Sequence, residues 1–393
     1  MSKQATWFTP EGIEDLLPES AKKLEHYRRQ LLDLFELHGY DLVLPPLAEF
    51  TDSLLTGKGQ HLAVDTCRFT DQESGQMMGV RADMTPQVAR IATNRMQGCD
   101  LLRLCYVGEV LKTRNNNAKG SRSPIAVVAE LFGHAGVESD IEVIDLMLDA
   151  IGVLTDTPLT LSLGQVSVVD ELMRFAELDA DQQNTLVAIL LRKALPEYQT
   201  FIASLALSDE LKSAFDLLPT LIGPSEQVLS QAQALVSVVP ALAEPLDRLN
   251  HVCAFLANRS QVAIHIDLSD LRGYQYHTGL IFSAYVDQCK WFPVARGGRY
   301  DEVGAAFGEK KAATGFSLDL RSALDWLPNG HAQKKIIFAP MQRDAAMNQA
   351  VKDLRAQGHI VKRFYQPSQM PNTGFVLKQM GATWEVVDIA TQG

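Results

Sequence analysis

The hydrophobic pattern of the chain is most distinctive between residues 103 and 133. The apolar run Leu104–Leu111 precedes a polar loop, and a second apolar run, Ile125–Phe132, follows it, which predicts a β-hairpin. The second run carries one carboxylate, Glu130, whose burial is costly unless a cation or a hydrogen-bond donor meets it. The hairpin is therefore either part of a pocket, in which the basic loop binds an anion and the carboxylate binds an amine, or an ordinary strand pair with a solvated turn. The basic residues of its loop are Lys112, Arg114, Lys119 and Arg122.

Upstream of this hairpin, apolar positions follow first a helical and then a strand period. Leu24, Tyr27 and Leu31 are spaced three to four residues apart, which predicts an amphipathic helix. Two short runs, Cys67–Thr70 and Met77–Arg81, flank a turn and predict a second hairpin.

Downstream, the pattern of apolar and polar residues changes twice. Ser139–Thr155 predicts a long helix, and residues 157–258 predict short amphipathic helices separated by Pro, Gly, Ser and Asp. Strand character resumes at Val262–Asp267. From residue 331 strands and helices alternate, with a short helix expected at Gly374–Met380, which predicts a small α/β domain with a partly parallel sheet.

Composition limits the class of protein. A chain of 393 residues exceeds what one core usually organises, so we expect two or three domains. The net charge of -11 argues against a body built mainly to bind nucleic acid. Five cysteines without C-x-x-C spacing favour reduced thiols over disulfides or a zinc site. With no signal segment, no membrane-length apolar run and no G-x-G-x-x-G motif, we expect a cytoplasmic protein without a metal or a cofactor.

Two groups of polar residues are candidates for a site. Asp83 and Thr85 come just before a predicted helix, where they either cap the helix or face a ligand. Arg272, Tyr276 and His277 lie among glycines between two predicted strands, which suits a place where the backbone approaches a ligand. A single histidine is more often structural, so the second group is open to both interpretations.

Taken together, these stretches resemble histidyl-tRNA synthetase, a class II aminoacyl-tRNA synthetase. TPEGIEDLLP and GYDLVLPPLAEF resemble its first signature, with Pro46 in the place of the interface proline. The hairpin at 103–133 resembles the second signature, and ARGGRYDEV with TGFSLDLR resembles the third. LRGYQYHTG resembles a histidine-specific segment. The resemblance implies an α+β fold with an antiparallel sheet flanked by helices, and a C-terminal domain resembling a shortened anticodon-binding domain.

This interpretation divides the chain into four segments. The two parts of the synthetase-like core are interrupted by the helical insertion and followed by the small α/β domain. The segments are 1–156, 157–258, 259–330 and 331–393.

The resemblance fails where the synthetase binds ATP. Its α-phosphate arginine, and the glutamate two residues later, correspond to Lys112 and Arg114; lysine lacks the bidentate fork of arginine, and an arginine inverts the charge of the glutamate. The adenine-stacking phenylalanine and an amine-holding glutamine fall on Pro124 and Ala126, and the third-signature arginine falls on Ser322. At about 1.5–3 kcal/mol for each lost charged contact, we expect ATP binding and aminoacylation to be lost. The basic side chains of the loop would then be free for a protein partner or solvent.

The amino-acid half of the synthetase site is better preserved. The resemblance implies that Asp83 and Thr85 stand where the synthetase holds the α-amino group, and that Glu130 stands where it meets polar groups of the substrate. Arg272 stands where the synthetase approaches the carboxylate side, and Tyr276 and His277 stand where it lines the imidazole slot. The candidate histidine-binding residues are Asp83, Thr85, Glu130, Arg272, Tyr276 and His277.

RADMTPQVAR (Arg81–Arg90) and GFSLDL (Gly315–Leu320) are more similar to the regulatory subunit of ATP phosphoribosyltransferase than to the synthetase. That resemblance implies a non-catalytic allosteric subunit, dimeric through the synthetase-like core, which joins a short-form catalytic subunit in a hetero-octamer of four chains each. It would activate the first step of L-histidine biosynthesis and take part in histidine feedback inhibition, with L-histidine as the candidate ligand. Two alternatives are an active histidyl-tRNA synthetase-like histidine ligase and a tRNA-sensing module, although tRNA is not the expected partner.

Overall fold

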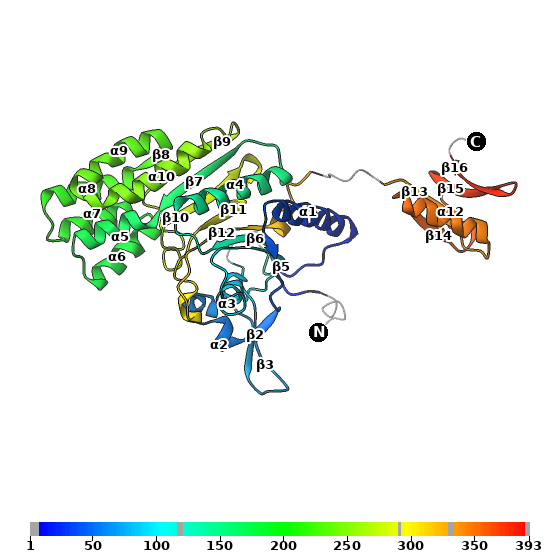
Figure 1. Cartoon of the computed structure of the whole chain (residues 1–393), viewed down its shortest axis with the longest axis horizontal. Helices are drawn as coiled ribbons and strands as arrows, with labels where there is room; N and C mark the ends of the chain where they lie inside the picture. Colours follow the sequence, from blue (N-terminus) through cyan, green and yellow to red (C-terminus); the bar gives the residue numbers. More distant parts are fainter. Residues whose placement is uncertain (1–7, 116–120, 290–291, 329–333, 390–393) are drawn as a thin grey trace. The chain divides into compact units, whose positions relative to one another are not determined.

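The structure of this chain is a computed structural model that describes residues 8–115, 121–289, 292–328 and 334–389. It divides into two compact units, Met1–Pro328 and Asn329–Gly393 (Figure 1). The first unit contains every residue that the sequence assigned to a site.

A nine-stranded sheet forms the centre of the described part of the first unit. Its strands are β1 (Asp41–Leu42), β5 (Leu102–Glu109), β6 (Ile125–Phe132), β7 (Leu159–Gln165), β8 (Ile222–Pro224), β9 (Val262–Asp267), β10 (Leu280–Val286), β11 (Ala295–Arg299) and β12 (Ala313–Asp319). They lie in the order β1-β5-β6-β12-β11-β10-β7-β9-β8. β1 is parallel to β5 and β7 to β9, whereas the other neighbouring pairs are antiparallel. The predicted α+β fold with a mainly antiparallel sheet is confirmed.

The predicted hairpin around the basic loop is formed by β5 and β6, in a register that places Leu104 opposite Glu130. Alternate side chains of a strand point to opposite faces of the sheet. Val127 and Ala129 therefore join the main core on one face, and Val128 joins a second core on the other. Glu130 shares the face of Val128. Because both faces of β6 are covered, its sequence is almost continuously apolar.

Two long helices cover the main-core face. The predicted first helix is α1 (Pro18–Leu37), which buries Leu24, Tyr27 and Leu31, and the periodic helix near residue 140 is α4 (Val137–Leu154). Both pack against the sheet and against each other, so the opposite face is left for the second core and the site.

A small three-stranded sheet stands beside that second face. The predicted hairpin at 67–81 is confirmed as β3 (Arg68–Thr70) and β4 (Met77–Val80), with β2 (Ala48–Phe50) on the other side of β4. The chain then enters α3 (Thr85–Asn94), which buries Val88 and Ala92 in the second core. This connection brings Asp83 and Thr85 to the start of α3.

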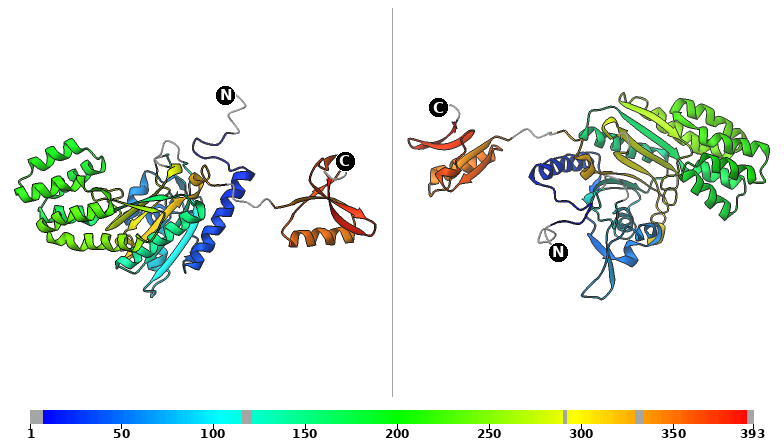
Figure 2. Two further views of the ribbon diagram at one scale, coloured as in Figure 1. Left: turned by 90° about the horizontal axis from the view of Figure 1, so that it is seen from above. Right: turned by 180° about the vertical axis from the view of Figure 1, so that it is seen from behind.

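The described residues between β7 and β9 form six α-helices beside the β8 end of the sheet (Figures 1 and 2). Residues 159–165, part of the predicted insertion, form β7 of the central sheet instead. Among these helices α10 packs against α4 and β7, and α9 against β8 and β9. The six are α5 (Val166–Phe175), α6 (Ala180–Leu191), α7 (Leu195–Ser204), α8 (Asp209–Leu217), α9 (Ser225–Val238) and α10 (Ala243–Leu256).

Short helical elements complete the connections. Two are α-helices and six are 3-10 helices among the described residues. They are α2 (Thr51–Leu54), α11 (Leu320–Ala323), η2 (Gly57–Ala63), η3 (Leu218–Thr220), η4 (Pro240–Leu242), η5 (Asp287–Cys289), η6 (Ala305–Phe307) and η7 (Pro367–Gln369).

The second unit pairs one helix with a four-stranded sheet of order β14-β13-β15-β16. It contains β13 (Ile336–Pro340), α12 (Ala345–Ala356), β14 (Ile360–Phe364), β15 (Phe375–Met380) and β16 (Thr383–Asp388). The predicted helix at Gly374–Met380 is wrong, because β15 pairs with both β13 and β16. A short apolar run such as FVL has no periodicity that separates a strand from a helix, so strand pairing decided this segment.

A buried ion-pair cluster joins the sheet to α4 and to the helical insertion. The carboxylate of Asp140 on α4 is fully buried and accepts hydrogen bonds from Arg299 Nε at 3.1 Å and from Arg248 Nη1, on α10, at 3.1 Å. The Arg299 guanidinium also donates to the carbonyl oxygens of His134 and Gly136. Every charge of the cluster therefore has a partner, as burial requires.

Removing one member of this cluster should destabilise the fold strongly. We expect Asp140→Ala to lower the free energy of unfolding by about 3–5 kcal/mol, because Arg299 would remain buried without a counter-charge. Urea denaturation followed by circular dichroism measures the change. Glu25→Ala is the matched control, since Glu25 pairs with Arg28 and Arg29 at the surface and should cost no more than about 1 kcal/mol. A loss for Asp140→Ala as small as the control would contradict this explanation.

Candidate functional site

A cavity of about 240 Å³ lies on the second face of the sheet. Cross-strand register defines its floor, because residues directly opposite each other on neighbouring strands share a face. One row of the floor is Ile281, Gly298, Gly315 and Glu130. Two residues along each strand, the next row is Ser162, Ser283, Arg296, Ser317 and Val128.

Gly315 makes the acidic end of this cavity possible. A Cβ atom at Gly315 would lie 2.4 Å from the Tyr300 hydroxyl and 2.8 Å from Glu130 Cγ, which is closer than atoms can pack. Glycine at this position therefore lets the two side chains meet across the strand.

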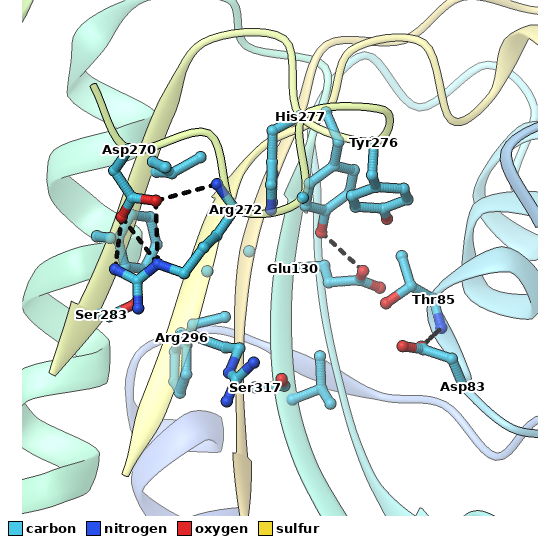
Figure 3. Close-up of a pocket in the computed structure, with 18 of the residues that line it drawn as sticks. Asp83, Thr85, Glu130, Asp270, Arg272, Tyr276, His277, Ser283, Arg296 and Ser317 are labelled. Atoms are coloured by element: carbon cyan, nitrogen blue, oxygen red, sulfur yellow. Dashed lines mark hydrogen bonds and ion pairs between the residues drawn. The ribbon is translucent and has the colours of Figure 1, made fainter. Parts of the chain in front are cut away.

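Glu130 is almost completely buried at this end of the cavity. The Tyr300 hydroxyl donates a hydrogen bond to Glu130 Oε1 at 2.7 Å (Figure 3). The other oxygen, Oε2, has no hydrogen-bond partner among the described residues. Burial raises the pKa of Glu130 to about 8, although the hydroxyl groups of Tyr300, Thr85 and Tyr106 oppose the shift. Near neutral pH the Glu130 carboxyl is therefore mostly protonated. A cation or an N–H donor close to it would favour its ionised form.

Asp83 and Thr85 stand beside Glu130 at the start of α3 (Figure 3). Asp83 Oδ1 accepts a hydrogen bond from the Thr85 backbone N–H at 2.8 Å, and the Thr85 hydroxyl lies 3.1 Å from the Tyr106 hydroxyl. Asp83 thus binds the backbone N–H of the first residue of α3 and also lines the cavity, so its contact with the helix start does not exclude contact with a ligand.

Aromatic side chains form one wall of the cavity. The ring centroid of Tyr276 lies 4.9 Å from that of Tyr300 and 5.3 Å from that of His277. Burial lowers the pKa of His277 to about 4, so its ring is neutral at pH 7. His277 Nδ1 donates to the carbonyl oxygen of Arg299 at 3.3 Å, which ties this wall to the Asp140 cluster.

The opposite end of the cavity is cationic. Arg272 Nε and Nη2 donate to the buried carboxylate of Asp270, and Nη1 donates to the Tyr285 hydroxyl at 2.8 Å. This ion pair raises the pKa of Arg272. Arg296 lies below Arg272 in Figure 3, next to Ser317. The cavity therefore has an acidic end and a cationic end, an arrangement suited to a zwitterion.

All candidate histidine-binding residues line this one cavity. The positions that correspond to the ATP site do not. Arg114 Nε pairs with Asp65 Oδ1 at 3.2 Å, and the Ser322 hydroxyl binds the Asp319 carboxylate. The positions outside the cavity lining are Lys112, Arg114, Pro124, Ala126 and Ser322.

The expectation that the loop cations are free for a partner is wrong for Arg114, which pairs with Asp65, and for Arg122. Its Nε donates to the carbonyl oxygen of Lys112 at 3.0 Å, and its backbone N–H donates to that of Gly12. These bonds hold the loop against the segment that precedes α1. Lys119 lies outside the described residues.

Several residues that line the cavity were not predicted as site residues. Among them, Tyr300 and Arg296 lie beside or on a strand, and Asp270 precedes Arg272 by two residues. Strand alternation carried a usable signal for Arg296, because it lies two positions from Gly298 and shares its face. Nothing in the sequence indicated that Tyr300 meets Glu130, since a contact across three strands depends on register.

Comparison with known proteins agrees with this geometry. Residues 12–323 match the family model described as histidyl-tRNA synthetase, and residues 334–369 match the one described as the ATP phosphoribosyltransferase subunit HisZ C-terminal domain. A Bacillus halodurans structure, described as an ATP phosphoribosyltransferase regulatory subunit/histidyl-tRNA synthetase, aligns with a TM-score of 0.77 at 26% identity, covering 94% of this chain and 95% of that one. The fold is that of a histidyl-tRNA synthetase-like protein of class II.

A curated relative decides between the members of this class. The ATP phosphoribosyltransferase regulatory subunit of Hydrogenovibrio crunogenus is 58% identical over 383 residues, which is 97% of this chain and 98% of the relative. The chain belongs to the family of ATP phosphoribosyltransferase regulatory subunits, so the predicted resemblance is confirmed.

A third likeness concerns the fold alone. One chain of a structure described as the ATP phosphoribosyl transferase (HisG:HisZ) complex from Thermotoga maritima aligns with a TM-score of 0.59 at 16% identity, covering 78% of this chain and 98% of that one. Residues 334–369, which match the C-terminal domain of the regulatory subunit, lie within the segment for which the sequence predicts a domain resembling a shortened anticodon-binding domain.

Two other kinds of feature are absent from the described residues. No helix there is both long and apolar enough to cross a membrane. In the same part of the chain, no three His, Cys, Asp or Glu side chains are grouped so that they could hold a metal ion.

The raised pKa of Glu130 predicts a pH dependence of stability. In the unfolded chain this carboxyl has its ordinary pKa of about 4.5, whereas in the folded chain burial raises the pKa to about 8, so the folded state binds more protons between these values. Stability should therefore fall as pH rises through this range. Below about pH 6.5 the neutral His277 acts in the opposite direction, because protonation of the unfolded histidine favours unfolding as pH falls.

The effect of Glu130 should stand alone between pH 6.5 and 8. Over this interval we expect the free energy of unfolding of the wild type to fall by up to about 1.5 kcal/mol relative to Glu130→Gln, since one proton per pH unit corresponds to about 1.4 kcal/mol. Urea denaturation at several pH values measures the difference. Parallel pH profiles for the two proteins would show that Glu130 titrates normally.

Proposed function

We propose that this chain is the non-catalytic subunit that binds and activates a short-form ATP phosphoribosyltransferase catalytic subunit, which performs the first step of L-histidine biosynthesis. L-Histidine, bound in the cavity, would transmit feedback inhibition. The observation that carries the proposal is a combination of two features. The candidate histidine-binding residues line one cavity of amino-acid size, and the positions that correspond to the ATP site carry other residues and lie outside its lining. The Hydrogenovibrio crunogenus relative and the Thermotoga maritima HisG:HisZ complex support the choice of partner.

The chemistry of the cavity suits histidine. Asp83 and the Thr85 hydroxyl can accept hydrogen bonds from an α-ammonium group at the edge of the cavity. Glu130 Oε2, which has no hydrogen-bond partner in the described structure, can accept a bond from an imidazole N–H. The rings of Tyr276 and His277 supply an aromatic wall for the imidazole. A ligand that meets all of these groups pairs polar atoms whose burial is otherwise costly.

The altered positions argue against adenylate chemistry. An ATP-binding site needs cations aimed at the phosphates. Of the two cations that replace the synthetase's α-phosphate arginine and glutamate, Lys112 lies outside the cavity and Arg114 is engaged by Asp65. This favours a regulatory role over a histidine ligase.

The assembly would be a hetero-octamer of four catalytic and four regulatory chains, with the regulatory chains paired through the synthetase-like core. Exposed apolar side chains around Pro46 support that pairing: Leu42 is 51%, Leu44 is 78% and Leu47 is 57% exposed in the single chain. Large apolar side chains left exposed together in one short segment are typical of a protein interface. Feedback inhibition would require histidine to bind the inactive state of the complex more tightly than the active state. A difference in binding free energy of about 1–3 kcal/mol is typical of allosteric coupling.

Co-purification tests the proposed partner. We expect the full-length chain to co-elute with a short-form ATP phosphoribosyltransferase chain in size-exclusion chromatography, and the complex to form phosphoribosyl-ATP faster than the catalytic chain alone. The rise in rate would come from stabilisation of the active conformation of the catalytic chain. Separate elution, or an unchanged rate in the co-eluting complex, would contradict the proposal.

Cavity substitutions test the route of feedback. We expect Asp83→Ala and Glu130→Ala to raise the histidine concentration for half-inhibition roughly ten- to a hundredfold, since each removes a charged hydrogen bond worth about 1.5–3 kcal/mol. Assembly should be intact by size-exclusion chromatography. Glu197→Ala, an exposed glutamate of the insertion, is the matched control. Unchanged inhibition in both cavity variants would place the histidine site outside this cavity.

A further inference from the structure

The cationic end of the cavity contains two arginines with different surroundings. Arg272 is held in place: Asp270 neutralises it through Nε and Nη2, and Tyr285 accepts from Nη1. The side chain of Arg296 makes no hydrogen bond or ion pair with any residue in the described ranges, and it is accessible from the cavity. Of the two, Arg296 is therefore the one with a full set of donors available to a ligand.

Hydroxyl groups flank Arg296 on both sides. Register places Ser283 of β10 and Ser317 of β12 directly opposite Arg296 on the neighbouring strands, and all three line the cavity. Cβ atoms of directly opposed residues lie about 4.5–5.5 Å apart. A guanidinium and two serine hydroxyls on the same part of the cavity floor supply N–H and O–H donors, which is the chemistry that binds an oxyanion.

The charge balance of the cavity also calls for an anion at this place. Arg272 and Asp270 cancel, which leaves the charge of Arg296 uncompensated at this end of the cavity. Desolvation of part of its side chain, and then the neighbouring charge of Arg272, lower the pKa of Arg296, although the residue as a whole is exposed. An anion bound here would relieve both effects.

Strand geometry gives the separation from the acidic end. Arg296 and Glu130 lie two strands apart and two residues along the strand direction. With strands about 4.8 Å apart and a rise of about 3.4 Å per residue, their Cα atoms are roughly 12 Å apart. Both side chains extend over the cavity floor, so one amino acid fits between them and can touch both ends.

We propose that Arg296, with the hydroxyls of Ser283 and Ser317, is the carboxylate-binding subsite of this cavity and selects ligands that carry a free α-carboxylate. This inference rests on the proposed function, in which the cavity binds an amino acid. It reassigns to Arg296 the role that the family resemblance implied for Arg272. The same donors could instead hold a separate phosphate, but a cavity of about 240 Å³ with an acidic opposite end favours a single zwitterion.

Paired ligands test the subsite. L-Histidine and L-histidinol differ only in that histidinol carries CH₂OH in place of the carboxylate. In isothermal titration calorimetry with the full-length chain at pH 7, we expect wild type to bind histidine at least tenfold more tightly than histidinol. Arg296→Gln should weaken histidine binding ten- to a hundredfold and change histidinol binding less than threefold, which removes the preference. Arg296→Lys should restore part of it, because lysine keeps the charge without the fork.

Controls separate this inference from the proposed function. Arg192→Gln removes an exposed arginine of the insertion and should leave both affinities unchanged. Equal losses for histidine and histidinol in Arg296→Gln, or no loss, would overturn the carboxylate assignment while the cavity remained a histidine site. Binding of neither ligand to wild type would overturn both proposals.

Inorganic phosphate distinguishes the two sources of an oxyanion. If Arg296 holds the carboxylate of histidine, phosphate should compete and weaken histidine binding to wild type but not to Arg296→Gln. If phosphate binds together with histidine, or strengthens its binding, Arg296 holds a separate anion and the proposal is wrong.

Discussion

The arrangement of the first unit depends on the buried pairing of Asp140 with Arg299. Asp140 comes from α4, Arg299 ends β11, and Arg248 reaches the same carboxylate from α10 of the insertion. The carbonyl oxygen of Arg299 in turn accepts hydrogen bonds from the Thr278 backbone and from His277. One fully paired charge cluster therefore connects the covering helix, the insertion and the aromatic wall of the cavity. Because uncompensated buried charges are so costly, these elements have little freedom to shift independently.

The cavity is shaped by contacts between side chains of neighbouring strands. The floor depends on glycine at position 315, which lets Tyr300 reach Glu130, and the two ends carry opposite charge. Glu130 is held mostly protonated by burial until a donor arrives, so ligand binding and proton release are linked there. Two of the positions that correspond to the synthetase's ATP site make structural contacts here: Ser322 binds Asp319, and Arg114 pairs with Asp65.

Much of the fold was predictable because its elements have strong local patterns. The hairpin around Glu130, the hairpin at 67–81 and the long helices appear where periodicity placed them. The failures have a common physical cause. FVL in β15 is too short to show a period, and residues 159–165 belong to the central sheet although they adjoin a helical region. In both places strand pairing with distant segments outweighs local preference.

The sequence alone determined the class of the protein and the residues of the acidic end, because signature motifs and a single carboxylate in an apolar strand are local features. Only the tertiary structure decided how those residues act together. It showed that Asp83 both binds the Thr85 backbone at the start of α3 and lines the cavity, and that Tyr300 is the partner of Glu130. It also showed that Arg272 is already neutralised by Asp270, which leaves Arg296 as the available cation. These relations depend on the register of strands far apart in the chain, which no local pattern encodes.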